Sequence, residues 1–185
     1  LRLSGVERQA DYAELARRNA KANDANLSVI EADLADLPIP LRQQQFDHVI
    51  ANPPYFRRGR GTAAPDDLRE VALGEDTPLA AWIDVATRRL APKGYLHVIQ
   101  RAERLPEVLA ACLGRLGSIE VLPCSARAGR EPELVIVRAR KSGRAAFRLR
   151  APCVLHAGAS HQAADSGYSA EIQAVLRDGA ALDWN

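Results

Sequence analysis

The 185 residues contain no methionine, and cysteine, histidine and aromatic side chains are scarce. The cysteines Cys112, Cys124 and Cys153 form no CxxC pair, so this odd, scattered set predicts reduced thiols in the cytosol rather than a disulfide framework. The four histidines lack the spacing of metal ligands, and we predict no metal site. No apolar run approaches the ~18 residues that span a bilayer, and nothing at the N-terminus reads as a signal peptide.

The remaining composition is that of an ordinary globular chain, with 47% hydrophobic and 26% charged residues. No internal repeat or low-complexity tract divides it, so we expect a single domain over residues 1–185. The sequence opens on Leu1-Arg2-Leu3 as though already inside a strand, and it lacks an initiating methionine. These two features lead us to expect a fragment of a longer protein.

The net charge of +2 conceals an uneven distribution. Between Arg127 and Arg150 there are eight Lys or Arg residues and two Glu residues, a local charge of +6. A second basic cluster contains Arg57, Arg58 and Arg60. Two basic segments in a nearly neutral chain favour an anionic partner, with nucleic acid the first candidate. The alternative is a basic surface that is merely solvated.

Hydrophobic periodicity predicts alternating strands and helices followed by a run of strands. This order is typical of an α/β fold whose mostly parallel sheet is completed by an antiparallel edge. In such sheets ligands bind beyond the carboxyl ends of the strands, where the sequence places Glu7, Asp33 and Asn52. The predicted strands are 1–7, 27–33, 46–51, 95–100, 118–126, 133–141 and 147–156, and the predicted helices are 7–23, 77–94, 104–117 and 169–179.

The strand 46–51 stops at the sequence Asn52-Pro53-Pro54-Tyr55. Asn-Pro and Pro-Pro are common turn dipeptides, so the motif could simply end a strand. The alternative is functional. Rigid prolines let the Pro53 carbonyl and the Asn52 side-chain carbonyl accept both hydrogens of one –NH2 group, while the aromatic ring of Tyr55 stacks on a flat substrate.

Such a two-acceptor clamp suits methylation of an amino group that is conjugated to a ring or a carbonyl. The lone pair of that nitrogen is delocalised, and the two accepted hydrogen bonds push electron density back onto it. They also stabilise the positive charge that grows on nitrogen as the methyl group arrives. No strong general base is required, because the nitrogen-bound proton becomes acidic once the new bond has formed.

The motif at the end of strand 46–51 resembles that of class I S-adenosylmethionine-dependent methyltransferases acting on amino groups. Three stretches, "FDHVIANPPYFRRGRGT", "LAPKGYLHVI" and "GYSAEIQAVLRDGAAL", are similar to the bacterial tRNA (adenine-N6)-methyltransferases, which modify the adenine beside the anticodon of a valine tRNA. The resemblance implies a Rossmann-like, three-layer α/β/α fold, S-adenosylmethionine as cofactor and the anticodon loop of tRNA as substrate.

Carried over to this chain, the resemblance implies that Glu7 holds the cofactor's ribose hydroxyls and that Asp33 accepts from its adenine amino group. Asn52, Pro53 and Tyr55 would form the catalytic clamp on the target base, with Asn52 also bordering the cofactor. Simpler structural roles exist for both carboxylates: a first-turn Glu is favoured by the helix dipole, and an Asp at this place can cap a turn.

The same resemblance places Phe56, Arg57, Arg58 and Arg60 on the RNA side of the site. Phe56 could be a second stacking surface or a core aromatic. The arginines, followed by Gly61, would hold phosphates around an adenine splayed from its loop, or they could form a solvated loop.

The sequence departs from the family in one respect, because the first strand and its GxGxG loop are absent. A sheet without that central strand would expose unpaired edges. We therefore expect the protein to continue upstream of Leu1, although a defective chain or a strand supplied by another chain would fit as well. Three other functions stay open: methylation of a protein glutamine, O- or N-methylation of a small molecule, and non-catalytic RNA binding.

Overall fold

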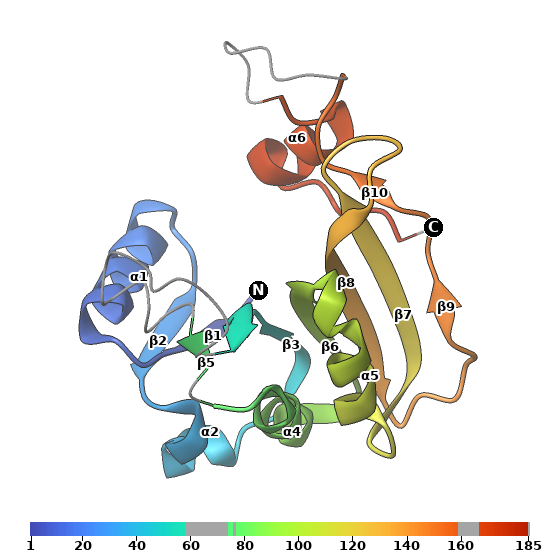
Figure 1. The fold of residues 1–185 in the computed structure, drawn as a ribbon. Coiled ribbons are helices and arrows are strands. Elements are labelled where there is room, and N and C mark those ends of the chain that lie inside the picture. The colour runs from blue at the N-terminus through green and yellow to red at the C-terminus, as the bar shows by residue number, and fades with distance from the viewer. Residues whose placement is uncertain (58–73, 76, 159–166, 185) are drawn as a thin grey trace. The chain divides into compact units, whose positions relative to one another are not determined.

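The computed structural model describes residues 1–57, 74–75, 77–158 and 167–184 (Figure 1). Within these ranges the chain divides into two compact units, Leu1–Gln45 and Phe46–Asn185. Arg58 and Arg60, which we predict to contact RNA, lie outside the described residues. No helix within the described ranges has the length and apolarity that crossing a bilayer requires.

The first unit is a β-α-β element followed by two short helical segments. Strands β1 (Leu3–Glu7) and β2 (Leu27–Glu31) pair in parallel, joined by helix α1 (Ala10–Ala22). The helix forms because its alanine-rich stripe recurs at helical spacing, and this stripe buries Ala13 and Ala20. The 3-10 helix η1 (Leu34–Asp36) and helix α2 (Ile39–Arg42) then complete the unit.

The second unit contains a mixed sheet with the strand order β10-β7-β8-β6-β3 and with β9 also paired to β7 (Figure 1). All pairings are parallel except those of β8, which lies antiparallel between β6 and β7. The strands are β3 (Phe46–Ala51), β6 (Leu90–Arg101), β7 (Leu116–Ser125), β8 (Pro132–Lys141), β9 (Arg148–Leu149) and β10 (Cys153–Val154).

Helices α4 (Leu79–Arg89) and α5 (Leu105–Cys112) pack on one face of this sheet (Figure 1). Alternate residues of the strands point to the helices, as the period of two requires. Leu96 and Val98 on β6 and Val137 on β8 are therefore completely buried against Ile83 and Val108 of the two helices. This core holds the carboxyl ends of β3 and β6 next to each other.

Three smaller elements complete the described chain. The two-residue strands β4 (Phe56–Arg57) and β5 (Gly74–Glu75) pair in parallel, and the 3-10 helix η2 (Ala102–Arg104) joins β6 to α5. Helix α6 (Ala170–Asp178) begins at Ser169, whose hydroxyl accepts from the amide of Ile172, and ends at Gly179 with φ of 68°. Ser at the N-cap and a left-handed Gly after the last turn are the expected end signals.

The predicted helix 77–94 is shorter in the structure, because α4 ends at Arg89 and β6 already begins at Leu90. The register with β3 shifts over the following residues, where Gly94 lies against the neighbouring backbone. A Cβ atom at Gly94 would come within 2.9 Å of the Asp47 carbonyl oxygen. The helix ends before Pro92 and Gly94 as predicted, but these two residues lie in the irregular first part of strand β6.

The predicted strand 147–156 is wrong as a continuous element. The structure has the two short strands β9 and β10 there, each paired in parallel with β7. Pro152 lies between them and has no amide hydrogen for the ladder, so the pairing breaks at that point.

Candidate substrate-binding turn and cofactor carboxylates

The turn Asn52–Tyr55 follows β3 directly, at the carboxyl end of this strand. Asn52 is exposed, and its side-chain amide makes no hydrogen bond to any residue that the structure describes. The Pro53 side chain is completely buried, and Tyr55 is half-buried. The turn is therefore anchored by a proline and presents an amide to the solvent.

Two buried polar side chains support this turn from behind. The Nε2 group of Gln100, at the end of β6, lies 3.2 Å from the Pro54 carbonyl oxygen and 3.4 Å from that of Pro53. The Nη1 group of Arg104, on η2, donates to the same Pro54 oxygen at 3.1 Å. Gln100 is completely buried and Arg104 is 5% exposed. Side chains of a neighbouring strand and its 3-10 helix thus hold the turn.

The buried guanidinium of Arg104 is balanced locally. Its Nη2 group donates at 2.9 Å to the carboxylate of Glu107, which lies in the first turn of α5. An unpaired buried charge would be costly, and this carboxylate offsets the cost. The amide oxygen of Gln100 is also hydrogen-bonded, because its Oε1 atom accepts from the Arg101 amide at 2.8 Å.

In the first unit, Glu7 is the last residue of β1. Its Oε1 atom accepts from the Gln9 amide at 2.9 Å, so part of the carboxylate supports the start of α1. The side chain is half-exposed. Because a carboxylate offers about four acceptor positions, Glu7 retains the capacity to bind hydroxyl groups.

Asp33 follows β2 and caps η1, with its Oδ1 atom accepting from the Ala35 amide at 2.8 Å. The capping role that the sequence allows is therefore present. The second carboxylate oxygen, Oδ2, lies 3.9 Å from the Arg8 guanidinium. The strand ends that carry Glu7 and Asp33 are adjacent, since the Ala32 amide donates to the Glu7 carbonyl oxygen at 3.0 Å.

The residues that we predict to contact RNA are described only in part. The backbones of Phe56 and Arg57 form β4, and their side chains are not among those the structure describes. Within the described ranges, no group of three or more His, Cys, Asp and Glu side chains could hold a metal ion.

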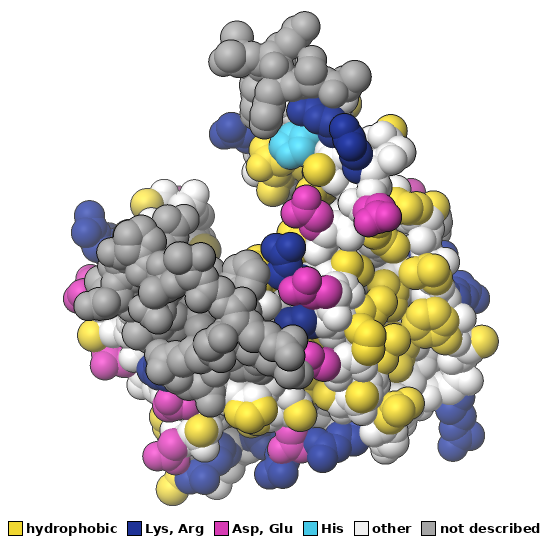
Figure 2. Space-filling model, in the orientation of Figure 1, with side chains coloured by type: hydrophobic (Ala, Val, Ile, Leu, Met, Phe, Trp, Pro, Cys, Tyr) yellow, Lys and Arg dark blue, Asp and Glu magenta, His cyan; other side chains and the backbone are white. Residues whose placement is uncertain are grey.

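The basic segment 127–150 is used largely in internal contacts. Arg138 on β8 and Arg150 both donate to the carboxylate of Glu120 on β7. Burial alone would raise the pKa of Glu120, but the hydrogen bonds and positive charges of the two arginines together outweigh it and lower the pKa. Arg127 donates to the Ala157 and Gly158 carbonyl oxygens at 2.9 and 2.8 Å. On the face of the molecule drawn in Figure 2, the Lys and Arg side chains of the described residues are interspersed with Asp and Glu side chains.

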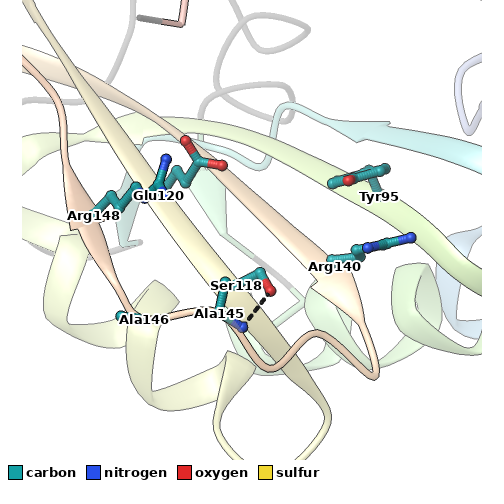
Figure 3. Close-up of a pocket in the computed structure, with 7 residues that line it drawn as sticks. All are labelled: Tyr95, Ser118, Glu120, Arg140, Ala145, Ala146 and Arg148. Carbon is teal, nitrogen blue, oxygen red and sulfur yellow. Dashed lines mark hydrogen bonds between the residues drawn. The ribbon is translucent and has the colours of Figure 1, made fainter.

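A shallow recess of about 190 Å³ lies on the sheet face opposite α4 and α5 (Figure 3). Tyr95 and Arg140 lie at one end, with the guanidinium carbon 5.3 Å from the ring centroid. Glu120 and Arg148 lie at the other end, and Ser118 accepts from the Ala145 amide between them at 3.0 Å. Glu120, the one carboxylate among the residues that line the recess, is already paired with two arginines, so the recess offers no free carboxylate to a substrate.

Comparison with known proteins identifies the family. The model of the methyltransferase small domain matches residues 1–121. The chain belongs to the methyltransferase small domain family. The match includes the ends of β1, β2 and β3, so Glu7, Asp33 and the Asn52–Tyr55 turn all lie within the matched part of this methyltransferase small domain.

This chain is similar in sequence to the tRNA1(Val) (adenine(37)-N6)-methyltransferase of Actinobacillus succinogenes, with 31% identity over 109 residues. The aligned region is 56% of this chain and 44% of that protein, and the chain spans about half the length of the curated relatives it matches.

Among solved structures, a predicted O-methyltransferase from Agrobacterium tumefaciens aligns with 97% of this chain and 78% of its own, at 26% identity and a TM-score of 0.71. A 16S rRNA methyltransferase of T. thermophilus, in complex with AdoMet and guanosine, aligns with 76% of this chain and 31% of its own. There the identity is 21% and the TM-score 0.51. These similarities confirm the predicted α/β, Rossmann-like fold class.

Sequence reasoning missed Gln100 and Arg104. Gln100 ends a strand-like run. A polar residue at that position suggests a contact with the Asn-Pro-Pro-Tyr turn only if the two strands are known to be neighbours in the sheet. The structure also explains two residues of the C-terminal segment. Tyr168 stacks on His156 with ring centroids 4.9 Å apart, and Ser169 caps α6.

Proposed function

We propose that this chain is part of an S-adenosylmethionine-dependent methyltransferase that methylates N6 of an adenine in tRNA. The observation that carries the proposal is the exposed Asn52 amide at the carboxyl end of β3, on a rigid Pro-Pro turn whose first proline, Pro53, is buried. The tRNA substrate is supported by the names of the similar curated proteins. The family match covers the whole first unit and the second unit as far as residue 121, which supports a single methyltransferase domain over residues 1–185.

The residues of the first unit fit the proposed cofactor. Two partly exposed carboxylates at adjacent carboxyl ends of parallel strands are acceptors suited to ribose hydroxyls and to an adenine amino group. We assign the first role to Glu7 and the second to Asp33, with Asn52 bordering the cofactor. When bound, S-adenosylmethionine would supply the methyl group.

The Asn52 side-chain oxygen and the Pro53 carbonyl oxygen then accept the two hydrogens of the adenine amino group. A carbonyl oxygen has two lone pairs, so the 3.4 Å contact from Gln100 leaves Pro53 able to accept a second hydrogen bond. As the nitrogen lone pair forms the new N–C bond, the two oxygens stabilise the charge on nitrogen. S-adenosylmethionine, held by Glu7 and Asp33, would supply the methyl group and would keep the electron pair of its former methyl–sulfur bond. One amino proton is released to water.

The aromatic ring of Tyr55 provides a stacking surface for the adenine, and we assign a second such surface to Phe56. Arg57, Arg58 and Arg60 follow this turn in sequence, and we propose that they contact phosphates of the anticodon loop. A tRNA substrate places the protein in the cytoplasm.

The first prediction is that Asn52→Ala strongly slows methyl transfer. The full-length native protein and its Asn52→Ala variant are each incubated with labelled S-adenosylmethionine and unmodified tRNA, and labelled N6-methyladenosine is quantified. Removing one preorganised acceptor is expected to lower kcat by about 10²–10³-fold. Because Asn52 is exposed and makes no described hydrogen bond, the melting temperature should stay close to that of the wild type.

Asn52→Asp is the matched control, because it keeps the acceptor oxygen and the size of the side chain and is expected to retain more activity than Asn52→Ala. Parallel reactions contain a glutamine-bearing peptide in place of tRNA. Transfer to the peptide but not to tRNA would replace the tRNA assignment with glutamine methylation. Retained tRNA binding without cofactor binding would favour a non-catalytic RNA-binding protein.

A further inference from the structure

We infer that Gln100 and Arg104 are positioning residues for the Asn52–Tyr55 turn, and that they set the direction of the acceptors that hold the substrate amino group. The inference rests on the proposed function. It starts from the three contacts by which these two side chains reach the Pro53 and Pro54 carbonyl oxygens, at 3.1 to 3.4 Å.

The turn depends on outside donors because of its own sequence. Pro53 and Pro54 have no amide hydrogen, so this stretch cannot form the backbone hydrogen bonds that stabilise most tight turns. The prolines fix two φ angles, but each ψ angle still decides where a carbonyl oxygen points. Gln100 and Arg104 supply the missing restraint, and both converge on the Pro54 oxygen.

The burial of these side chains is hard to explain by packing alone. The other inward positions of β6, such as Leu96 and Val98, are apolar. Gln100 continues the same row and is completely buried, and Arg104 is buried beyond it. Burying an amide and a guanidinium costs free energy unless both are bonded, and an apolar pair would avoid that cost. The Nε2 group of Gln100 and the Nη1 group of Arg104 both donate to the turn, which indicates that holding its geometry is their role.

Neither side chain needs to touch the substrate. Gln100 and Arg104 act through the backbone of the turn, which carries the Pro53 acceptor and fixes the starting direction of the Asn52 side chain. An acceptor displaced by about 1 Å can reduce the rate of reaction by about 10²-fold. Losing one donor should therefore lower the rate of methyl transfer to tRNA far more than it weakens binding of the cofactor.

The test uses Gln100→Leu and Arg104→Gln, singly and together, in the full-length native protein. Each single variant is expected to lower kcat/KM for tRNA by about 10-fold and the double variant by about 100-fold. The Kd for S-adenosylmethionine, measured by calorimetry, should change by less than about twofold. Arg104→Lys keeps a cationic donor and is expected to recover part of the loss.

Arg88→Gln is the matched control, because it makes the same chemical change at an exposed α4 arginine that is paired with Asp84 at 2.9 Å. It should leave kcat/KM unchanged. An equal loss of tRNA methylation and of cofactor binding in the Gln100 and Arg104 variants would show a general structural role and overturn the inference.

A second readout separates this inference from the proposed function. Hydrogen exchange of the peptide covering residues 52–57 is measured without substrate, and the variants should raise its exchange while peptides from α4 stay as protected as in the wild type. Unchanged exchange in the double variant would overturn the positioning role even if methylation is observed. Raised exchange in a protein that does not methylate tRNA would support the positioning role while the proposed function fails.

Discussion

At the scale of single residues, the two histidines of the sheet face opposite the helices are coupled. His48 on β3 and His97 on β6 stack with ring centroids 5.5 Å apart, and His48 Nδ1 lies 3.2 Å from His97 Nε2. Burial lowers the pKa of His97, and the nearby His48 and Arg138 lower it further. Protonating both rings would place like charges side by side beside a guanidinium.

This pair predicts a loss of stability in acid. The unfolded chain takes up a proton on His97 near its ordinary pKa, whereas the folded chain resists it until a lower pH. The free energy of unfolding therefore falls as the pH decreases from above the ordinary value toward the folded pKa. Urea denaturation from about pH 7.5 to about pH 5.5 measures this slope.

His97→Gln is expected to flatten the slope, because the variant carries no ring to protonate. Tyr95→Phe keeps both histidines and the ring beside them, and it should retain the wild-type slope. A His97→Gln slope equal to that of the wild type would assign the acid sensitivity to other groups.

The residues also show where sequence reasoning succeeds and where it stops. Asp33 could be predicted at the end of a strand, because the apolar run before it is clear, and its capping bond follows from local chemistry. Gln100 and Arg104 could not be predicted as partners of the turn. They lie 46 to 50 positions from the Pro54 carbonyl oxygen that they bind, and only the pairing of β3 with β6 brings them together.

At the scale of elements, β7, β8 and the segment after β9 are joined by one acidic side chain. The carboxylate of Glu120 is 15% exposed and accepts from Arg138 and Arg150, whose side chains are 25% and 19% exposed. Removing its charge would leave two partly buried guanidinium groups without their anion. The antiparallel pair β7–β8 and the C-terminal segment should therefore depend on Glu120 together.

We predict that Glu120→Gln lowers the free energy of unfolding by about 1.5–3 kcal/mol, the range for hydrogen bonds to charged groups. Chemical denaturation at neutral pH measures the change. Glu131→Gln, an exposed position in the connection before β8, should stay within about 0.5 kcal/mol of the wild type. A similar change in both variants would mean that the Glu120 ion pairs contribute no more than a surface charge.

The elements also show which patterns the sequence carries reliably. Strand 46–51 could be predicted to the residue, because a short apolar run is closed by Asn-Pro-Pro. The break between β9 and β10 could not be predicted, since the alternating pattern of residues 147–156 hides the effect of Pro152 on the β-ladder. The position of β8 between β6 and β7 is a consequence of long-range pairing, which periodicity alone does not encode.

At the scale of the whole molecule, the two compact units have very different cores. A cluster of buried apolar side chains lies entirely within Phe46–Asn185 and contains residues from Ala51 to Ala139. Among the described residues of Leu1–Gln45, the buried apolar side chains are Ala13, Ala20, Leu37 and Leu41. Because burial of apolar area is the main stabilising contribution, the first unit has much less intrinsic stability.

This contrast predicts two levels of hydrogen-exchange protection in the polypeptide Leu1–Asn185. Amides of β6 and β8 should exchange slowest, because the core on α4 and α5 covers them. Amides of α1 and β2 should exchange faster, because the local unfolding that exposes them costs less free energy. Mass spectrometry of peptides from the two units, at several urea concentrations, would show the first unit losing protection before the second. If both units were equally protected and lost protection in one step, they would unfold as a single cooperative domain. The stability of that domain would then not be determined by the second unit alone.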